Sequence, residues 1–202
     1  RSYSPDGTRY DMTQLVTMTG GVNPVYAWFT TKITDRNGNY ANITYKASAS
    51  PEISNITTSD GRVINFSYAD SGLLSRRVTQ ISSAGQTWSY GYQAIPGVTS
   101  KYFLTSVTRP DGTSWGYSYN GNLNTLPGSH VMSTVKYPQG GSIAYGYDFV
   151  YFDNQANPMS RSTVISKKTS STGGIWTFNY APGSLSNYDT TTVSKPTGTI
   201  TY

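Results

Sequence analysis

A single spacing recurs along this chain of 202 residues and restricts its fold more than any other feature. Six glycines are each followed, seven residues later, by a tyrosine. The glycines are Gly38, Gly61, Gly85, Gly112, Gly140 and Gly173, and the tyrosines are Tyr45, Tyr68, Tyr92, Tyr119, Tyr147 and Tyr180. Successive glycines lie roughly 20 to 35 residues apart, which is the period of repeat arrays.

The residues between each glycine and its tyrosine alternate in size. Bulky residues stand three and five positions after the glycine, whereas small or polar residues stand four and six positions after it. The bulky set comprises Ala41, Ile43, Ile64, Phe66, Trp88, Tyr90, Trp115, Tyr117, Ile143, Tyr145, Trp176 and Phe178. A period of two predicts a β-strand, because successive side chains leave a pleated backbone on opposite sides.

Turn-forming residues precede most of these glycines. Asn37-Gly38, Asp60-Gly61 and Asp111-Gly112 are pairs that favour the positive backbone angles of tight hairpin turns. A β-branched residue stands five positions before four of the glycines, at Ile33, Ile56, Val107 and Val135. Each repeat is therefore predicted to be a strand, a turn and a second strand.

The series predicts an all-β fold of about seven tandem hairpins in one long antiparallel sheet. Because each hairpin can bury its bulky face only with its neighbours' help, we expect one array over residues 1–202 without a domain boundary. Composition agrees, since charged residues make up only 12% against about 25% in typical globular proteins, and 18 tyrosines are present.

The net charge of +5 does not by itself indicate a nucleic-acid partner. The 15 basic residues are scattered, and the only adjacent pairs are Arg76-Arg77 and Lys167-Lys168. Nucleic-acid binding uses stripes or runs of positive charge. We therefore interpret the basic residues as a solvated surface and expect no nucleic acid as partner.

The absence of cysteine excludes disulfides and thiolate chemistry. No apolar run approaches the length that spans a bilayer, and no signal peptide opens the sequence. Patterned segments at both ends of the chain suggest a piece of a longer protein.

Acidic residues offer little support for catalysis. Asp6, Asp60 and Asp111 directly precede glycines, where aspartate forms turns, and only Glu52 and Asp153 lack a position in the repeat. A glycan-cleaving enzyme would need two carboxylates about 5 to 10 Å apart across a groove. We therefore predict no catalytic residues and no cofactor.

Other candidate sites have simpler interpretations. His130, the only histidine, falls in a connection between repeats and is interpreted as a surface loop residue. A calcium site near Asp148, Asp153, Asn154 and Asn157 does not match the spacing of the helix-flanked calcium loop, so no metal site is predicted. The Asn-x-Ser/Thr sequences at Asn42, Asn55 and Asn65 are interpreted as ordinary residues of the hairpins.

The aromatic face is the strongest candidate for function. It comprises Trp88, Tyr90, Tyr92, Trp115, Tyr117, Tyr119, Tyr145, Tyr147, Trp176, Phe178 and Tyr180. We expect equivalent rings from neighbouring hairpins to stack into ladders that stabilise the sheet. The alternative is an exposed Trp and Tyr surface that binds carbohydrate or an apolar cargo.

Three segments carry a resemblance to a known family. Residues 104–120 read LTSVTRPDGTSWGYSYN, residues 32–45 read KITDRNGNYANITY, and residues 56–68 read ITTSDGRVINFSY. This series resembles the RHS or YD repeats of bacterial Rhs toxins, toxin-complex shell subunits and teneurins. The copies with Gly85 and Gly173 depart from the pattern, because neither glycine follows Asp or Asn.

The resemblance implies a sheet of hairpins that curves and spirals into a hollow shell around a C-terminal toxin or other cargo domain. It implies a non-enzymatic segment of a secreted or exported bacterial protein, whose partners are the rest of the shell and its cargo. The paired Asp-Pro-x-Gly motifs of the family's self-cleaving region do not occur here. With too few hairpins to close a shell, this chain is expected either to pack against the rest of the shell or to associate with itself edge to edge.

Overall fold

The computed structural model describes residues 1–18, 25–46, 52–69, 77–98, 101–120, 130–151, 161–182 and 189–202. These residues form strands joined by turns, with no helix among them, so the all-β prediction is confirmed. Hydrogen-bonded strand order follows chain order from β1 to β16, and every pairing with a described register is antiparallel. The strands cluster into two compact units, Arg1–Tyr90 and Gly91–Tyr202.

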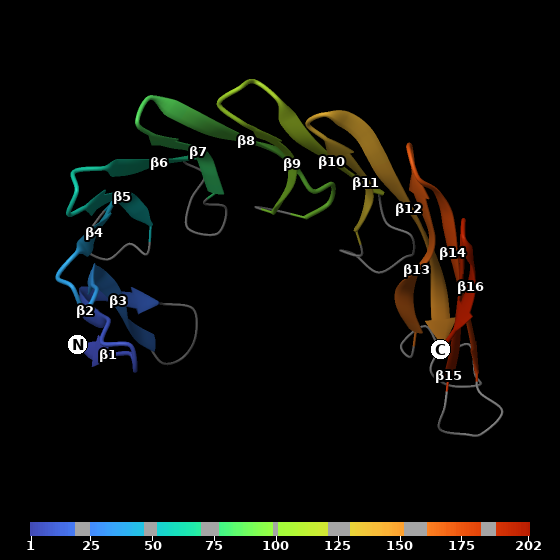
Figure 1. Ribbon diagram of the computed structural model, residues 1–202, viewed down its shortest axis with the longest axis horizontal. Helices are drawn as coiled ribbons and strands as arrows, with labels where there is room; N and C mark the ends of the chain where they lie inside the picture. Colours follow the sequence, from blue (N-terminus) through green and yellow to red (C-terminus); the bar gives the residue numbers. More distant parts are fainter. Residues whose placement is uncertain are drawn as a thin grey trace. The chain divides into compact units, whose positions relative to one another are not determined.

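The first unit contains seven strands and the first part of an eighth (Figure 1). They are β1 (Ser2–Tyr3), β2 (Arg9–Met18), β3 (Val25–Thr34), β4 (Tyr40–Tyr45), β5 (Ile53–Thr58), β6 (Val63–Ala69), β7 (Arg77–Ser83) and β8 (Gln86–Ala94).

The second unit begins within β8 and contains eight further strands. They are β9 (Tyr102–Thr108), β10 (Ser114–Asn120), β11 (Val131–Tyr137), β12 (Gly140–Tyr151), β13 (Arg161–Ser170), β14 (Gly174–Pro182), β15 (Asp189–Lys195) and β16 (Gly198–Thr201).

The described strands make eight hairpins, two more than the six that the glycine-to-tyrosine spacing marks. One of the two, β15 with β16, turns at Gly198, and the other, β1 with β2, turns at Gly7, whose φ is 87°. The residue seven positions after Gly7 is Gln14, so a search based on tyrosine misses this copy.

Four turns share one backbone geometry. In residues 4–8, 35–39, 58–62 and 109–113, the glycine N–H donates to the carbonyl three residues earlier, and the first residue's N–H donates to the carbonyl of the fifth. This is a three-residue hairpin loop that closes with a left-handed residue. Gly38, Gly61 and Gly112 have φ values of 89°, 85° and 80°, which confirms their predicted positive backbone angles.

The other turns differ in detail. Ala84 and Gly85 both have positive φ, at 49° and 75°, as a two-residue type I′ hairpin requires. Gly140 has a φ of 92°. At the sixth repeat, Gly173 lies in the turn, but the left-handed residue is its neighbour Gly174, with a φ of 90°.

Side-chain burial is shallow throughout the described residues. Only one of their hydrophobic side chains is fully buried, that of Val16, which is 3% exposed. All the described strands belong to a single sheet. The bulky side chains therefore lie half-buried against their neighbours along the sheet.

Candidate functional site

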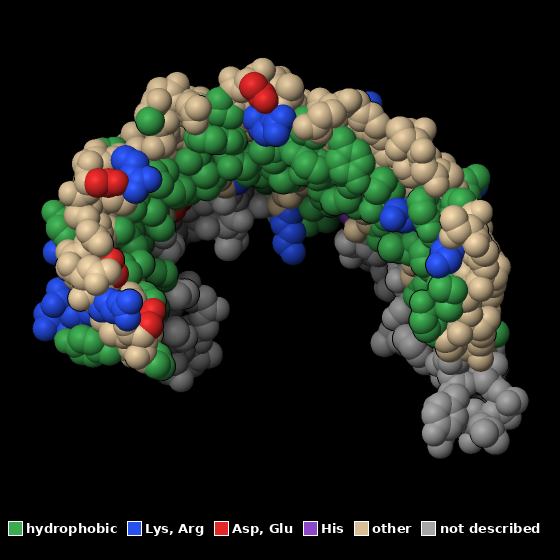
Figure 2. All heavy atoms as spheres, viewed as in Figure 1, with side chains coloured by type: hydrophobic (Ala, Val, Ile, Leu, Met, Phe, Trp, Pro, Cys, Tyr) green, Lys and Arg blue, Asp and Glu red, His purple; other side chains and the backbone are tan. Residues whose placement is uncertain are grey.

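The two faces of each hairpin differ as the alternation predicts. In β4, Ala41, Ile43 and Tyr45 are half-buried whereas Asn42 and Thr44 are exposed, and β6 repeats this pattern. We call the side that holds the repeat tyrosines the bulky face and the opposite side the polar face. Within each unit, hydrophobic side chains gather along one side of the strands (Figure 2).

The structure places the predicted aromatic residues on strands, at the same positions in each repeat. Trp88, Tyr90 and Tyr92 lie on β8, Trp115, Tyr117 and Tyr119 on β10, Tyr145 and Tyr147 on β12, and Trp176, Phe178 and Tyr180 on β14. All are half-buried except Tyr180, which is 38% exposed.

The expected stacking of equivalent aromatic residues is wrong. The residue directly opposite Trp88 is Ile81, that opposite Trp115 is Val107, and that opposite Trp176 is Lys168. Each hairpin contributes two strands, so equivalent positions in successive hairpins are about 10 Å apart. The face therefore alternates aromatic residues with residues from the first strand of each hairpin.

The ring contacts on this face are between residues at non-equivalent positions of the repeat. Phe103 stacks on Tyr119 with ring centroids 4.2 Å apart, and Trp115 meets Tyr137 edge to face at 5.0 Å. Phe29 contacts Tyr45 at 5.9 Å in the same edge-to-face manner. Such pairs stabilise a sheet by about 0.5–1.5 kcal/mol beyond their burial.

The repeat tyrosines share a hydrogen bond that the sequence pattern did not reveal. In five hairpins the hydroxyl donates to the backbone carbonyl fifteen residues earlier, on the first strand of the same hairpin. The pairs are Tyr45 with Thr30 (2.7 Å), Tyr68 with Ile53 (2.9 Å), Tyr119 with Leu104 (2.9 Å), Tyr147 with Met132 (2.7 Å) and Tyr180 with Ile165 (3.0 Å). We call this bond the tyrosine tie.

Each tie lies where the backbone ladder of its hairpin has ended. In the β9–β10 hairpin the last paired residues are Gly116 and Ser106, and Tyr119 then reaches the carbonyl of Leu104. The β5–β6 hairpin ends at Asn55 and Asn65 in the same way, before Tyr68 reaches Ile53. A buried carbonyl without a partner is costly, so the tyrosine hydroxyl replaces the missing ladder bond.

A β-bulge accompanies four of the ties. Pairing with the next strand shifts register between Thr44 and Tyr45, Ser67 and Tyr68, Ser118 and Tyr119, and Gly146 and Tyr147. The extra residue on the next strand is Ser54, Thr79, Ser133 or Ser166 respectively. A hydroxyl residue seven positions before a turn glycine, as at Ser54, Ser133 and Ser166, was the signal that could have predicted these bulges.

Burial affects the acidity of the tied tyrosines. Loss of solvation raises the pKa of Tyr45, Tyr68, Tyr119 and Tyr147 above that of a free phenol. The hydroxyls are therefore protonated donors at neutral pH, as the tie requires.

Cations also lie on the bulky face. The Lys168 ammonium stands 4.7 Å from the Trp176 ring centroid, and the Lys46 ammonium stands 4.9 Å from that of Tyr68. Glu52 lies 3.7 Å from Lys46, which gives this carboxylate an ionic partner.

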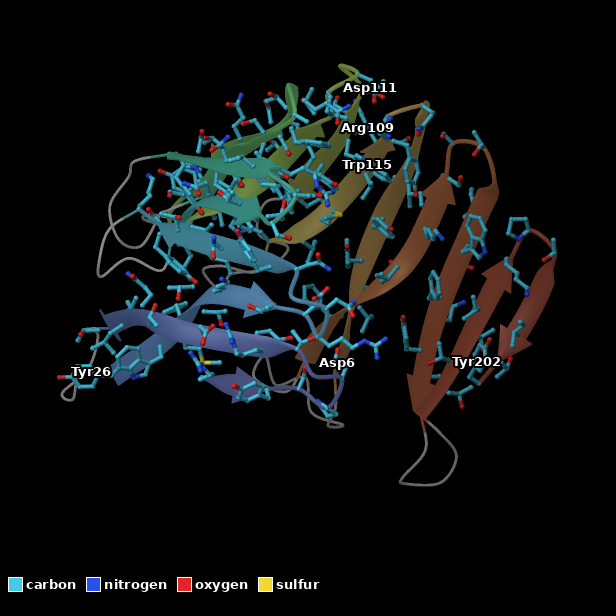
Figure 3. The ribbon with its side chains drawn as sticks, turned by 60° about the vertical axis from the view of Figure 1, so that its left-hand side comes forward. Asp6, Tyr26, Arg109, Asp111, Trp115 and Tyr202 are labelled. Carbon is cyan, nitrogen blue, oxygen red and sulfur yellow. The ribbon has the colours of Figure 1, made fainter. Side chains whose placement is uncertain are left out.

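The acidic residues of the turns are hydrogen-bond acceptors. Thr113 donates to the Asp111 carboxylate from its hydroxyl at 2.6 Å and its backbone N–H at 3.0 Å, and these bonds lower the pKa of Asp111. The side-chain bond from Asn39 lowers the pKa of Asp35 in the same way. Arg109 pairs with Asp111 at 3.2 Å, and both lie in the turn that precedes Trp115 (Figure 3).

The remaining candidates for chemistry are dispersed. Asp153, Asn154 and Asn157 lie outside the described residues, so neither the calcium site nor the carboxylate pair that the sequence argued against has a described geometry. Among the described residues, no three His, Cys, Asp or Glu side chains come together as metal ligands. Asn42 and Asn65 are exposed strand residues. Within the same residues no helix is long and apolar enough to cross a bilayer.

The interpretation of His130 as a surface loop residue needs correction. His130 directly precedes β11 and is half-buried, with its ring 5.0 Å from that of Phe103. Its Nδ1 atom is shielded from solvent and has no hydrogen-bond partner among the residues that the structure describes. The ring lines a shallow hollow of about 200 Å³ together with Gln93, Pro96, Phe103, Tyr117, Ser118 and Tyr119.

The fold and its ties define a class of protein, a single-sheet array of tandem β-hairpins. We found no matching protein-family model and no matching curated protein, so the resemblance to RHS repeats depends on the repeat pattern alone.

Proposed function

We propose that this chain is a non-enzymatic segment of the wall of an RHS-repeat shell, which encloses a C-terminal toxin or other cargo domain. The complete protein is proposed to be secreted or exported by bacteria. Its partners are the remaining shell hairpins and the enclosed cargo.

The observation that best supports this proposal is a sheet that lacks a core of its own. Among the described residues the bulky face is half-exposed, and only Val16 is fully buried. Hydrophobic surface of this extent is stabilised when another surface covers it. A wall one sheet thick that meets a cargo or the opposite wall of a shell supplies such a cover.

The tyrosine ties also suit a wall built from repeats. Each tie joins the two strands of one hairpin, and backbone pairing joins that hairpin to its neighbours. Stability in such arrays is a sum of unit and nearest-neighbour contributions, so hairpins can be added until a shell closes. The turns accordingly tolerate several sequences.

Carbohydrate binding by the repeated aromatic face is less well supported. Trp88, Trp115 and Trp176 are half-buried, and directly opposite them stand Ile81, Val107 and Lys168. Acrylamide quenching distinguishes the two functions, because packed tryptophans are quenched weakly and an open binding platform is quenched strongly.

Protease protection tests the shell directly. The complete protein containing these residues would carry an epitope tag on its C-terminal domain and be digested with proteinase K before and after urea denaturation. Enclosure predicts a domain that survives in the native protein and is degraded after denaturation. Equal degradation rates in the two states would overturn the proposal.

The isolated chain gives a second test. Unpaired strand edges are templates for association, so the chain is expected to form oligomers or to bind the missing hairpins. Light scattering measures this, and a monodisperse monomer at micromolar concentration without a partner would count against the edge-to-edge prediction.

A further inference from the structure

Strands β2 and β3, which belong to neighbouring hairpins and pair with each other, present an exposed aromatic pair that the repeat pattern does not include. Tyr26 is 62% exposed and Trp28 is 59% exposed, and both lie on β3 two residues apart. On β2 the residue opposite Trp28 is Leu15, which is 39% exposed, and the residue opposite Tyr26 is the exposed Thr17. We call these four side chains the β2–β3 platform.

The platform lies on the polar face of this strand pair. Tyr26 and Trp28 alternate along β3 with Ala27 and Phe29, and Phe29 contacts the repeat tyrosine Tyr45 on the bulky face. The residue opposite Ala27 is Val16, the one fully buried hydrophobic side chain among the described residues. This strand pair therefore packs one face and exposes two large rings on the other, where β4 and β6 expose Asn, Thr and Ser together with the less exposed Tyr40 and Val63.

The chemistry of the platform is aromatic, hydroxylic and uncharged. Two rings at positions i and i+2 of a strand lie about 7 Å apart along it. Trp and Tyr combine a flat apolar surface with a polar N–H or O–H group, and Thr17 adds a hydroxyl beside Tyr26. The Tyr26 ring stands clear of the strand (Figure 3).

We propose that the β2–β3 platform binds a neutral carbohydrate. A pyranose ring has an axial C–H surface that lies flat on an aromatic ring, and hydroxyls around its edge that pair with the Tyr26 and Thr17 hydroxyls. None of the four side chains is charged, so anionic polysaccharides gain no ion pair on it. Two adjacent rings suit two sugar units of one chain.

The size of the platform favours a sugar over a protein partner. Aromatic side chains present at most about 250 Å² each, so two rings exposed by about six tenths offer roughly 300 Å². A stable protein interface, including one with a second copy of this chain, needs about 800 Å² per partner. This inference is independent of the shell proposal, because the platform faces away from the bulky face.

Binding would be measured with three neutral hexasaccharides, cellohexaose, laminarihexaose and maltohexaose, by isothermal titration calorimetry with the 202-residue chain. We expect at least one to bind, Trp28→Ala to weaken its Kd at least tenfold, and Tyr26→Ala to weaken it by a smaller factor. Tyr202→Ala is the matched control, since this 73% exposed tyrosine lies outside the platform, and it should leave Kd unchanged.

A spectroscopic readout separates loss of the site from loss of folding. Bound sugar should reduce acrylamide quenching in the native chain but not in Trp28→Phe, which keeps an aromatic ring and should leave the circular dichroism spectrum unchanged. Binding by none of the three sugars, equal loss in Tyr202→Ala, or binding to alginate alone would overturn the proposal. A change of oligomeric state in Trp28→Ala would also overturn it, because it would assign the platform to a second copy of the chain.

Discussion

The β9–β10 and β13–β14 hairpins of the second unit form the same tie in different surroundings. Tyr119 donates to Leu104 at 2.9 Å beneath a stacked Phe103 ring, and a β-bulge precedes it. Tyr180 donates to Ile165 at 3.0 Å but is 38% exposed, and its pairing with β15 continues without a register shift. The repeat spacing therefore determines that the tyrosine hydrogen bond forms, whereas the neighbouring strands determine how much that bond contributes to stability.

The turns of the β9–β10 and β13–β14 hairpins differ in what determines their backbone conformation. The 109–113 turn is closed by its own Asp111, and a Cβ added to Gly112 would meet nothing within 4 Å. The 170–174 turn has no aspartate, and a Cβ added to Gly174 would lie 2.7 Å from Cγ of Pro196. The first turn is determined locally and the second by contact with the next hairpin.

Substituting alanine for Gly112 and Gly174, the glycines with positive φ in these two turns, should give the largest difference in stability loss between the two hairpins. Gly112→Ala adds backbone strain of about 1–2 kcal/mol, whereas Gly174→Ala adds the same strain and an overpacking cost of about 1–3 kcal/mol. Urea unfolding measures both losses. Equal losses of unfolding free energy in the two variants would contradict the steric role assigned to Pro196. Adding Pro196→Ala to the Gly174→Ala variant should bring its loss closer to that of Gly112→Ala.

Removing the tyrosine hydroxyls should give the next largest contrast. Tyr119→Phe leaves the half-buried Leu104 carbonyl without its partner and should lower the unfolding free energy by about 1–2 kcal/mol. Tyr180→Phe should cost less than about 0.5 kcal/mol, because water can replace the lost donor. Tyr202→Phe serves as a control with no effect, and a Tyr180→Phe loss as large as that of Tyr119→Phe would show that burial does not set the strength of the tie.

Alkaline pH should weaken the buried ties. Burial raises the pKa of Tyr119, so the folded chain retains a proton that the unfolded chain loses above pH about 10. The stabilisation is full below that pH and is lost as pH rises through the raised pKa. Urea midpoints between pH 8 and roughly 11.5 should fall less steeply in Tyr119→Phe than in the native chain; parallel curves would argue against this assignment.

The smallest expected effect concerns a turn that contains neither Asp nor Asn. Ala84 has a φ of 49°, a conformation in which glycine is less strained. Ala84→Gly should therefore stabilise the β7–β8 hairpin by about 0.5 kcal/mol in thermal unfolding. A loss of stability would mean that the methyl group makes a contact worth more than the strain it causes.

Sequence predicted the hairpins because their determinants are local. Asp111-Gly112 specifies its turn without help from another strand, and the alternation from Ala41 to Tyr45 specifies which face is bulky. The Gly7 hairpin shows the limit of the glycine-to-tyrosine spacing, since it keeps the Asp-Gly turn and has Gln14 in place of the tyrosine.

The features that sequence did not predict depend on how strands pair. Stacked tryptophans were expected at equivalent positions, but the intervening strand places Val107 opposite Trp115. The tyrosine tie requires knowing where the ladder ends, and the platform at Tyr26 and Trp28 requires knowing which face Phe29 occupies. Strand register determines all three features, and register cannot be read from the amino-acid composition.

The central claim, that these hairpins form part of the wall of a shell, is tested most directly by electron cryomicroscopy of the complete protein. The account predicts a closed shell in which residues 1–202 form part of the wall, with density for the cargo domain inside and against the bulky face. An open sheet with no enclosed density, and with the bulky face in solvent, would contradict it.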